Sequence, residues 1–353
     1  MKVLIIVELI SRDLLGFLKL KNALEKKSYN VFFCNRYNFI ESYNYFLPQV
    51  VIAPQLYKIP GLKRIKNKSY LIYLRSESFA SNVKFCYEDY LIQKKEIVPN
   101  AIFYWGKVDY LHFKKKMKKD NKVVHYISGH PMNDIWYKYK DAKKKGNKIG
   151  ICSTLKTVTT GVGSNNPFKI IDEMVENKDF ENASRYYNKN AGPEFYLAYE
   201  NSFISIVLNL CKNLKNLSIR PAPYEDMKYY DFIEKKFKVE IDKSSNYLDW
   251  LIQNNTIIAF KSSVQITAYV LGINVINLEK IINPKILSGL NKHTLSFVFD
   301  KYFYQPKNLK ELMSKIKSIS FKRNKKIDKF ILDTYSINLN KRFVSCDSII
   351  SFL

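Results

Sequence analysis

Two serines follow a short apolar run, at a point where a phosphate group could bind. Ser262 and Ser263 come directly after the run 256–260 and Lys261, and precede apolar positions at helical spacing up to a glycine at 272. This pattern predicts a strand, a turn, a helix and a glycine stop. Hydroxyls and unpaired backbone N–H groups at a helix start favour an anion, typically a phosphate. Simple capping of the helix by the serines is the competing interpretation.

Arg220 and Glu225 are further candidates for the same ligand, because they follow another apolar run, 217–220. A guanidinium can bind a phosphate through two parallel hydrogen bonds, and a carboxylate can accept a hydrogen bond from a ribose hydroxyl. For Arg220 the alternative is a structural ion pair at the strand end. For Glu225 it is a solvated carboxylate at a turn. Gln265, just inside the predicted helix, is the last candidate for binding this phosphate-bearing ligand.

Asp13 and Glu77 are candidates for proton transfer, since each follows an apolar run in the first half of the chain. Either carboxylate could act as a general base or as a nucleophile toward an acceptor hydroxyl. Ser11 and Arg12 stand beside Asp13, in a predicted loop 8–13, and could contact the molecule that carries this hydroxyl or an acidic group on it. The alternatives are a helix-start carboxylate for Asp13 and a helix cap or surface charge for Glu77.

The elements that must position these residues alternate between strand and helix patterns. The first half has strand patterns at 2–7, 29–34, 49–53, 70–74, 101–105 and 123–127, and the second at 148–152, 217–220, 238–241, 256–260, from 275, and 295–299. Such alternation predicts two doubly wound parallel sheets of the α/β class. Ligands bind outside the carboxyl ends of such strands, where the polar residues above lie. We expect domains at 1–140 and 148–325, a basic linker between them, and a helical tail at 326–353.

The composition indicates which cellular compartment and which classes of partner to expect. The 353 residues include 58 Lys and Arg against 32 Asp and Glu, a formal net charge of +26. That charge indicates an anionic partner such as a phosphorylated substrate or a membrane surface, although solvated lysines are the simpler alternative. Five scattered cysteines and four histidines show no metal-ligand spacing and indicate a reduced cytoplasmic protein without metal or cofactor. No nucleic-acid-binding module is present.

Four short motifs resemble those of the GT-B glycosyltransferases of bacterial surface-carbohydrate synthesis, related to retaining Kdo transferases and to CDP-glycerol glycerophosphotransferases. They are the first strand and loop at 7–16, Trp105-Gly106 with Gly129-His130-Pro131-Met132-Asn133-Asp134, Arg220-Pro221-Ala222-Pro223-Tyr224-Glu225, and Lys261-Ser262-Ser263 with the helix after it. Two departures stand out: Ala222 replaces the family's histidine, and the glutamate of the serine motif is missing. Asp134 is expected to cap a helix that begins at Ile135.

The resemblance implies two Rossmann-like domains facing across a cleft, with nucleotide phosphate at the serine motif. It implies metal-independent transfer of a sugar from a nucleotide-activated donor, with CMP-Kdo or another CMP-linked acidic sugar as the first expectation. The acceptor would be a surface polysaccharide, lipopolysaccharide or lipid-linked glycan, with peripheral contact at the inner face of an anionic membrane. The alternatives are a CDP-glycerol-type glycerophosphotransferase, a nucleotide-sugar epimerase of the same fold, and a non-catalytic polyanion binder.

Overall fold

The structure, a computed structural model, divides into two compact units. It describes residues 1–353 except 9, 57–58, 66, 76–86, 88–89, 96, 118–121, 141–145, 154–192, 223–224, 261, 283–299 and 341–343. Unit 1 combines residues 1–139 with 324–353, and unit 2 is residues 140–323. Among the described residues, no helix is long and apolar enough to cross a membrane. The expected strand at 295–299 lies outside the described residues.

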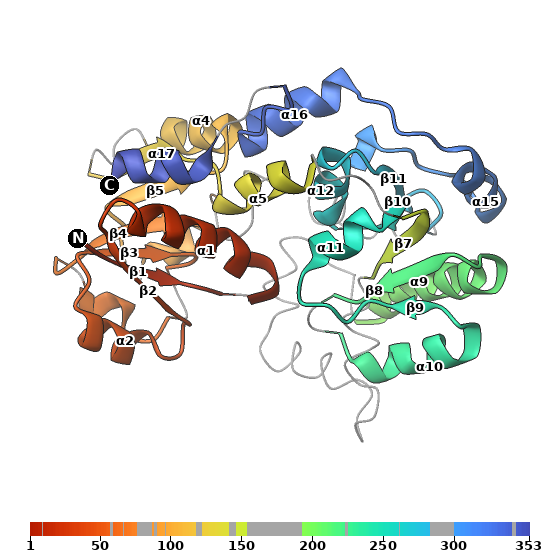
Figure 1. The fold of residues 1–353 in the computed structure, drawn as a ribbon, viewed down its shortest axis with the longest axis horizontal. Coiled ribbons are helices and arrows are strands. Elements are labelled where there is room, and N and C mark those ends of the chain that lie inside the picture. The colour runs from red at the N-terminus through yellow and green to blue at the C-terminus, as the bar shows by residue number, and fades with distance from the viewer. Residues whose placement is uncertain are drawn as a thin grey trace. The chain divides into compact units, whose positions relative to one another are not determined.

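Unit 1 is built on a six-stranded parallel sheet in the order β2-β1-β3-β4-β5-β6 (Figure 1). Its strands are β1 (Lys2–Ile6), β2 (Asn30–Cys34), β3 (Val50–Ala53), β4 (Tyr70–Leu74), β5 (Ala101–Tyr104) and β6 (Val124–Ile127). Its helices are α1 (Ile10–Glu25), α2 (Phe39–Phe46), the 3-10 turn η1 (Leu62–Ile65), α4 (Lys107–Lys116), α5 (Pro131–Lys140, which ends at the boundary of unit 2), α16 (Lys325–Tyr335) and α17 (Ser345–Phe352).

Unit 2 is built on a five-stranded parallel sheet in the order β11-β10-β7-β8-β9. Its strands are β7 (Lys148–Cys152), β8 (Leu217–Arg220), β9 (Glu240–Ile241), β10 (Asn254–Ala259) and β11 (Asn274–Asn277). Its helices are α9 (Pro193–Asn213), α10 (Met227–Phe237), α11 (Tyr247–Ile252), α12 (Val264–Val270), the 3-10 turn η3 (Asp300–Tyr302) and α15 (Leu309–Ser318).

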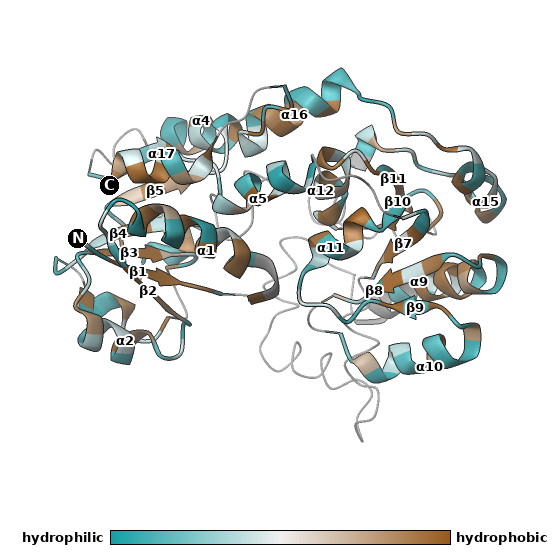
Figure 2. Ribbon diagram, in the orientation of Figure 1, coloured by the Kyte–Doolittle hydropathy of each residue, from teal (hydrophilic) through white to brown (hydrophobic). Residues whose placement is uncertain are grey.

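Both sheets are buried on their two faces, which explains the continuous apolar runs of their strands. In unit 1, alternate β1 residues enter different cores: Leu4 and Ile6 face the side that contains α2, and Val3 and Ile5 face the side that contains α1. In Figure 2 the apolar residues concentrate in the strands and on one side of the surrounding helices. The predicted fold class, two Rossmann-like parallel-sheet domains, is confirmed.

The segment after residue 324, expected as a tail, belongs to unit 1. Cys346 and Ile349 of α17 are buried in the same core as Val3 and Phe17. Asp134 is not the cap of a helix starting at Ile135, because α5 already begins at Pro131. Its buried carboxylate instead accepts hydrogen bonds from the backbone N–H groups of Ser345 and Cys346, at 2.8 and 2.9 Å. It therefore caps α17, more than 200 residues later.

The Trp105-Gly106 motif packs against α16, which also belongs to the C-terminal segment of unit 1. The Trp105 ring stacks on His130, with ring centroids 4.2 Å apart, and contacts Tyr335 edge-on. A Cβ atom on Gly106 would lie 2.4 Å from the carbonyl carbon of Thr334. Gly106 has extended backbone angles that any residue adopts, so close approach of α16, and not backbone conformation, requires glycine here.

Candidate functional site

The carboxyl ends of the unit 2 strands meet along one edge. The strand register aligns Cys152 of β7 with Arg220 of β8 and with Ala259 of β10, which in turn aligns with Asn277 of β11. The residues that follow these strand ends therefore gather at one edge of the sheet. We call this set the unit 2 edge: Ser153, Arg220, Ala222, Glu225, Asp242, Ser262, Ser263, Gln265 and Asn277. It contains the donor-binding residues expected from the sequence.

Glu225 is a buried hydrogen-bond centre at this edge, with 7% of its surface exposed. One carboxylate oxygen accepts from the Ser153 hydroxyl at 3.2 Å. The other accepts from the Tyr230 hydroxyl at 2.5 Å and from the Ala222 backbone N–H at 3.0 Å. Glu225 thus ties the loop after β8 to the end of β7 and to α10. This geometry differs from the solvated carboxylate considered as the alternative.

Burial and the charge of Glu225 act on the ionisable groups around it. Burial raises the pKa of the Tyr230 hydroxyl far above its usual range, and the adjacent carboxylate raises it further. Burial also raises the pKa of the Cys152 thiol to about 12, against a lowering effect of Arg220. Both groups therefore stay protonated at neutral pH. The sequence analysis did not single out Ser153 or Tyr230. Ser153 directly follows β7, and Tyr230 lies in α10.

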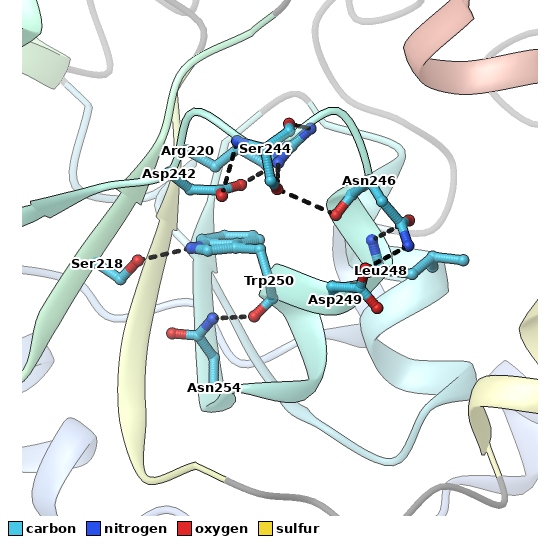
Figure 3. A network of polar contacts seen from close by, with 9 residues as sticks. All are labelled: Ser218, Arg220, Asp242, Ser244, Asn246, Leu248, Asp249, Trp250 and Asn254. Carbon is cyan, nitrogen blue, oxygen red and sulfur yellow. Dashed lines mark hydrogen bonds and ion pairs between the residues drawn. The ribbon is translucent and has the colours of Figure 1, made fainter.

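Arg220 lies in an ion pair with Asp242, which follows β9 (Figure 3). The two side chains are only 13% and 11% exposed. A second guanidinium nitrogen donates to the backbone carbonyl of Ser244 at 3.1 Å. This is the structural pair considered as the alternative to phosphate binding. Its guanidinium remains at the unit 2 edge, but a phosphate there would share it with Asp242.

The same network fixes the neighbouring helix α11. The Asn246 side chain caps this helix by accepting from the backbone N–H of Leu248 at 3.1 Å. Trp250 is fully buried and donates from its indole nitrogen to Ser218 Oγ at 2.6 Å (Figure 3). These contacts hold the segment 242–250 firmly against β8 and so fix the position of Arg220.

The serine turn differs from the arrangement expected of a free helix start. Helix α12 has seven residues and begins at Val264. The Ser262 hydroxyl accepts from the Val264 N–H at 3.3 Å, and the N–H groups of Gln265 and Ile266 bond the carbonyls of the two serines. These N–H groups are therefore used within the turn. The Ser263 side chain is exposed and makes no capping hydrogen bond.

Gln265 is fully buried and shapes this turn. Its amide nitrogen donates to the Ser262 carbonyl at 3.0 Å, and its amide oxygen accepts from Asn277 at 3.0 Å. Both ends of the amide therefore bond the protein itself. The geometry gives Gln265 the role of a positioning residue that links the turn to the end of β11.

The expected acceptor-side residues belong to unit 1. Helix α1 begins at Ile10, so the predicted loop 8–13 is wrong from residue 10 onward. Asp13 lies in the first helical turn, with its side chain fully buried. A carboxylate there is stabilised by the helix dipole. Ser11 and Arg12 lie in the same turn, with side chains outside the described part of the structure. Glu77 lies outside the described residues.

Comparisons with known proteins agree on the fold. No protein-family model and no curated protein sequence matches this chain. Among solved structures, the UDP-GlcNAc 2-epimerase of Methanocaldococcus jannaschii matches with a TM-score of 0.54 and 12% identity, over 100% of this chain and 99% of that one. The S. aureus MnaA–UDP co-structure matches with a TM-score of 0.53 and 11% identity, over 99% and 95%.

The wall teichoic acid polymerase TagF, in a structure with CDPG, has a TM-score of 0.52 and 11% identity, over 99% of this chain and 87% of that one. The similarity therefore spans both units and is not confined to one Rossmann-like domain. At these identities it establishes the fold.

Proposed function

We propose that this chain is an enzyme that binds a nucleotide-linked sugar or a nucleotide-linked glycerol at the unit 2 edge. The observation that carries the proposal is the full-length agreement of its fold with structures that hold UDP or CDPG. The convergence of the strand ends on one edge supports it, because ligands of doubly wound sheets bind there. Two of the four sequence motifs, the one from Arg220 to Glu225 and the serine motif, fall on the same edge.

Residue roles in this proposal follow the geometry. The exposed Ser263 hydroxyl, with Ser262, contacts the nucleotide phosphate, and Arg220 adds positive charge that it shares with Asp242. Glu225 and Gln265 hold the two loops in place. In unit 1, Asp13 and Glu77 are the groups that we propose for proton transfer, with Ser11 and Arg12 near the acceptor. No metal ion or other cofactor is part of this proposal.

Two reaction types have support from the fold, and the nucleotide distinguishes them. Epimerisation of a UDP-linked sugar agrees with the M. jannaschii enzyme, and transfer of glycerol phosphate from a CDP-linked donor agrees with TagF. Transfer of a CMP-linked acidic sugar rests on sequence resemblance alone. In each case the product would enter surface-carbohydrate synthesis, and the reaction would take place in the cytoplasm.

We expect isothermal titration to detect UDP, CDP or CMP binding, and the tightest of them to indicate the reaction type. Ser263→Asp should weaken that nucleotide about ten- to a hundred-fold, because it places a negative charge beside the phosphate and removes a hydroxyl. The exposed Ser314→Asp in α15 carries the same charge change and should bind as the wild type does. Absence of binding by all three nucleotides would refute the proposal. Equal binding by the Ser263 variant would mean that the phosphate binds at another place.

A further inference from the structure

Helices α4 and α16 of unit 1 pack side by side (Figure 1), and each of them has exposed residues. Their close approach is fixed where Gly106 meets the backbone of Thr334. We define the α4–α16 face as the exposed residues of these two helices. They are Lys107, Val108, Leu111, Lys114, Lys115, Lys116, Lys325, Lys326, Lys329 and Leu332.

The charge of this face is strongly positive. Across the two helices there are seven lysines and three carboxylates. Of the carboxylates, Asp109 is fully buried, Asp328 is half-buried, and Asp333 pairs with Lys329 at 2.8 Å. Lys114 also donates to the Tyr110 hydroxyl at 2.7 Å. The remaining lysines give the face an excess of positive charge, which attracts an anionic surface.

Aliphatic side chains are exposed among these lysines. Leu111 is 52% exposed, Leu332 43% and Val108 38%. The spacing of Val108 and Leu111 places both on one side of α4. A soluble helix normally turns such residues inward, and here the inward side is already occupied by Phe113 of α4 and by Ile327 and Ile331 of α16, all buried. Aliphatic residues flanked by lysines are typical of helices that lie in a membrane interface.

We propose that the α4–α16 face is a docking surface for an anionic lipid bilayer. The lysines bind the lipid headgroups, and Leu111, Leu332 and Val108 enter the boundary between headgroups and acyl chains. A nucleic acid is the less suitable occupant, because single-stranded binding relies on stacking by exposed aromatic rings, and the apolar residues of this face are aliphatic. The net charge alone does not locate a membrane contact on the protein surface, whereas the exposed residues of α4 and α16 do.

Co-sedimentation with vesicles of equimolar phosphatidylglycerol and phosphatidylcholine tests this face in two ways. The triple variant Lys114→Gln, Lys115→Gln, Lys116→Gln should bind about a hundred-fold more weakly at low salt, since each lysine near an anionic surface contributes roughly a factor of five. This difference should shrink as salt rises. The double variant Leu111→Ser, Leu332→Ser should bind about tenfold or more weakly, and its deficit should persist at high salt, because it removes apolar burial.

Matched controls use exposed residues elsewhere in unit 1. Lys26→Gln, Lys27→Gln, Lys68→Gln makes the same charge change, and Tyr45→Ser, Leu47→Ser removes a similar apolar surface. Both should bind vesicles within about threefold of the wild type, and all variants should keep the wild-type circular dichroism and thermal transition. Equal losses in test and control variants would overturn the proposal. So would wild-type vesicle binding by the leucine variant, or retention of the protein on RNA but not on vesicles.

Discussion

Glu225→Ala is expected to destabilise the protein by about 2–4 kcal/mol and to abolish measurable nucleotide binding. The substitution leaves the Tyr230 hydroxyl, the Ser153 hydroxyl and the Ala222 N–H without their shared acceptor in a largely buried position. A hydrogen bond to a charged group contributes about 1.5–3 kcal/mol, and part of that loss is recovered by water or by local rearrangement. The loop after β8 would then lose its side-chain bond to Ser153, and only the backbone bond from the Ser153 N–H to the Arg220 carbonyl, at 3.0 Å, would still join it to the end of β7.

Urea denaturation measures the first effect and nucleotide titration the second. Glu234→Ala on α10 is the matched control, because its partner Lys243 and Glu234 itself are about half exposed, and such pairs contribute little. Its stability should lie within about 0.5 kcal/mol of the wild type. Wild-type stability in Glu225→Ala would mean that the loop is held by other contacts.

Gly106→Ala should lower the free energy of unfolding by about 1–3 kcal/mol or more and should weaken the packing of α16. The new Cβ would lie 2.4 and 2.5 Å from the carbonyl carbon and oxygen of Thr334 and 2.6 Å from the Asp333 oxygen. These are backbone atoms, so relief requires movement of the helix rather than of one side chain. Hydrogen exchange in 325–335 should accelerate more than exchange in the strands of unit 2.

Val108→Ala serves as the control for Gly106→Ala, because it changes an exposed residue two positions further along the same region. It should alter the free energy of unfolding by less than about 0.5 kcal/mol. If Gly106→Ala matched this control in stability and in hydrogen exchange, α16 would have to lie further from the Trp105-Gly106 turn than the structure places it.

The sequence predicted the strands well because parallel strands buried on both faces leave a clear apolar pattern. The runs at 29–34, 70–74 and 217–220 differ from the observed strands by at most one residue. Helix starts were less accurate: nothing in the order Glu8 to Asp13 distinguishes a loop from a first helical turn until packing buries Asp13.

The candidate site was predictable in position but not in the partners of its side chains. Arg220 and Glu225 were found from their place after a strand, yet their partners Asp242, Ser153 and Tyr230 come from other elements. Such polar contacts have no periodicity that a sequence pattern can show. The same reason hid the bond from Asp134 to α17, whose two ends are joined only by the tertiary fold.

The return of the chain to unit 1 has a consequence for its synthesis on the ribosome. One apolar layer of the first sheet is completed by Cys346, Ile349 and Phe352, while Val3, Phe17 and Leu24 of that layer are made more than 300 residues earlier. At ordinary rates of about 5–20 residues per second, the early residues wait roughly 15–65 s for the late ones. Unit 2 is complete before α17 is made, so it can fold first, whereas this apolar layer of unit 1 still lacks the residues of α17. Nascent chains stalled before residue 344 should therefore recruit chaperones that bind such faces, and release should follow once α17 has emerged.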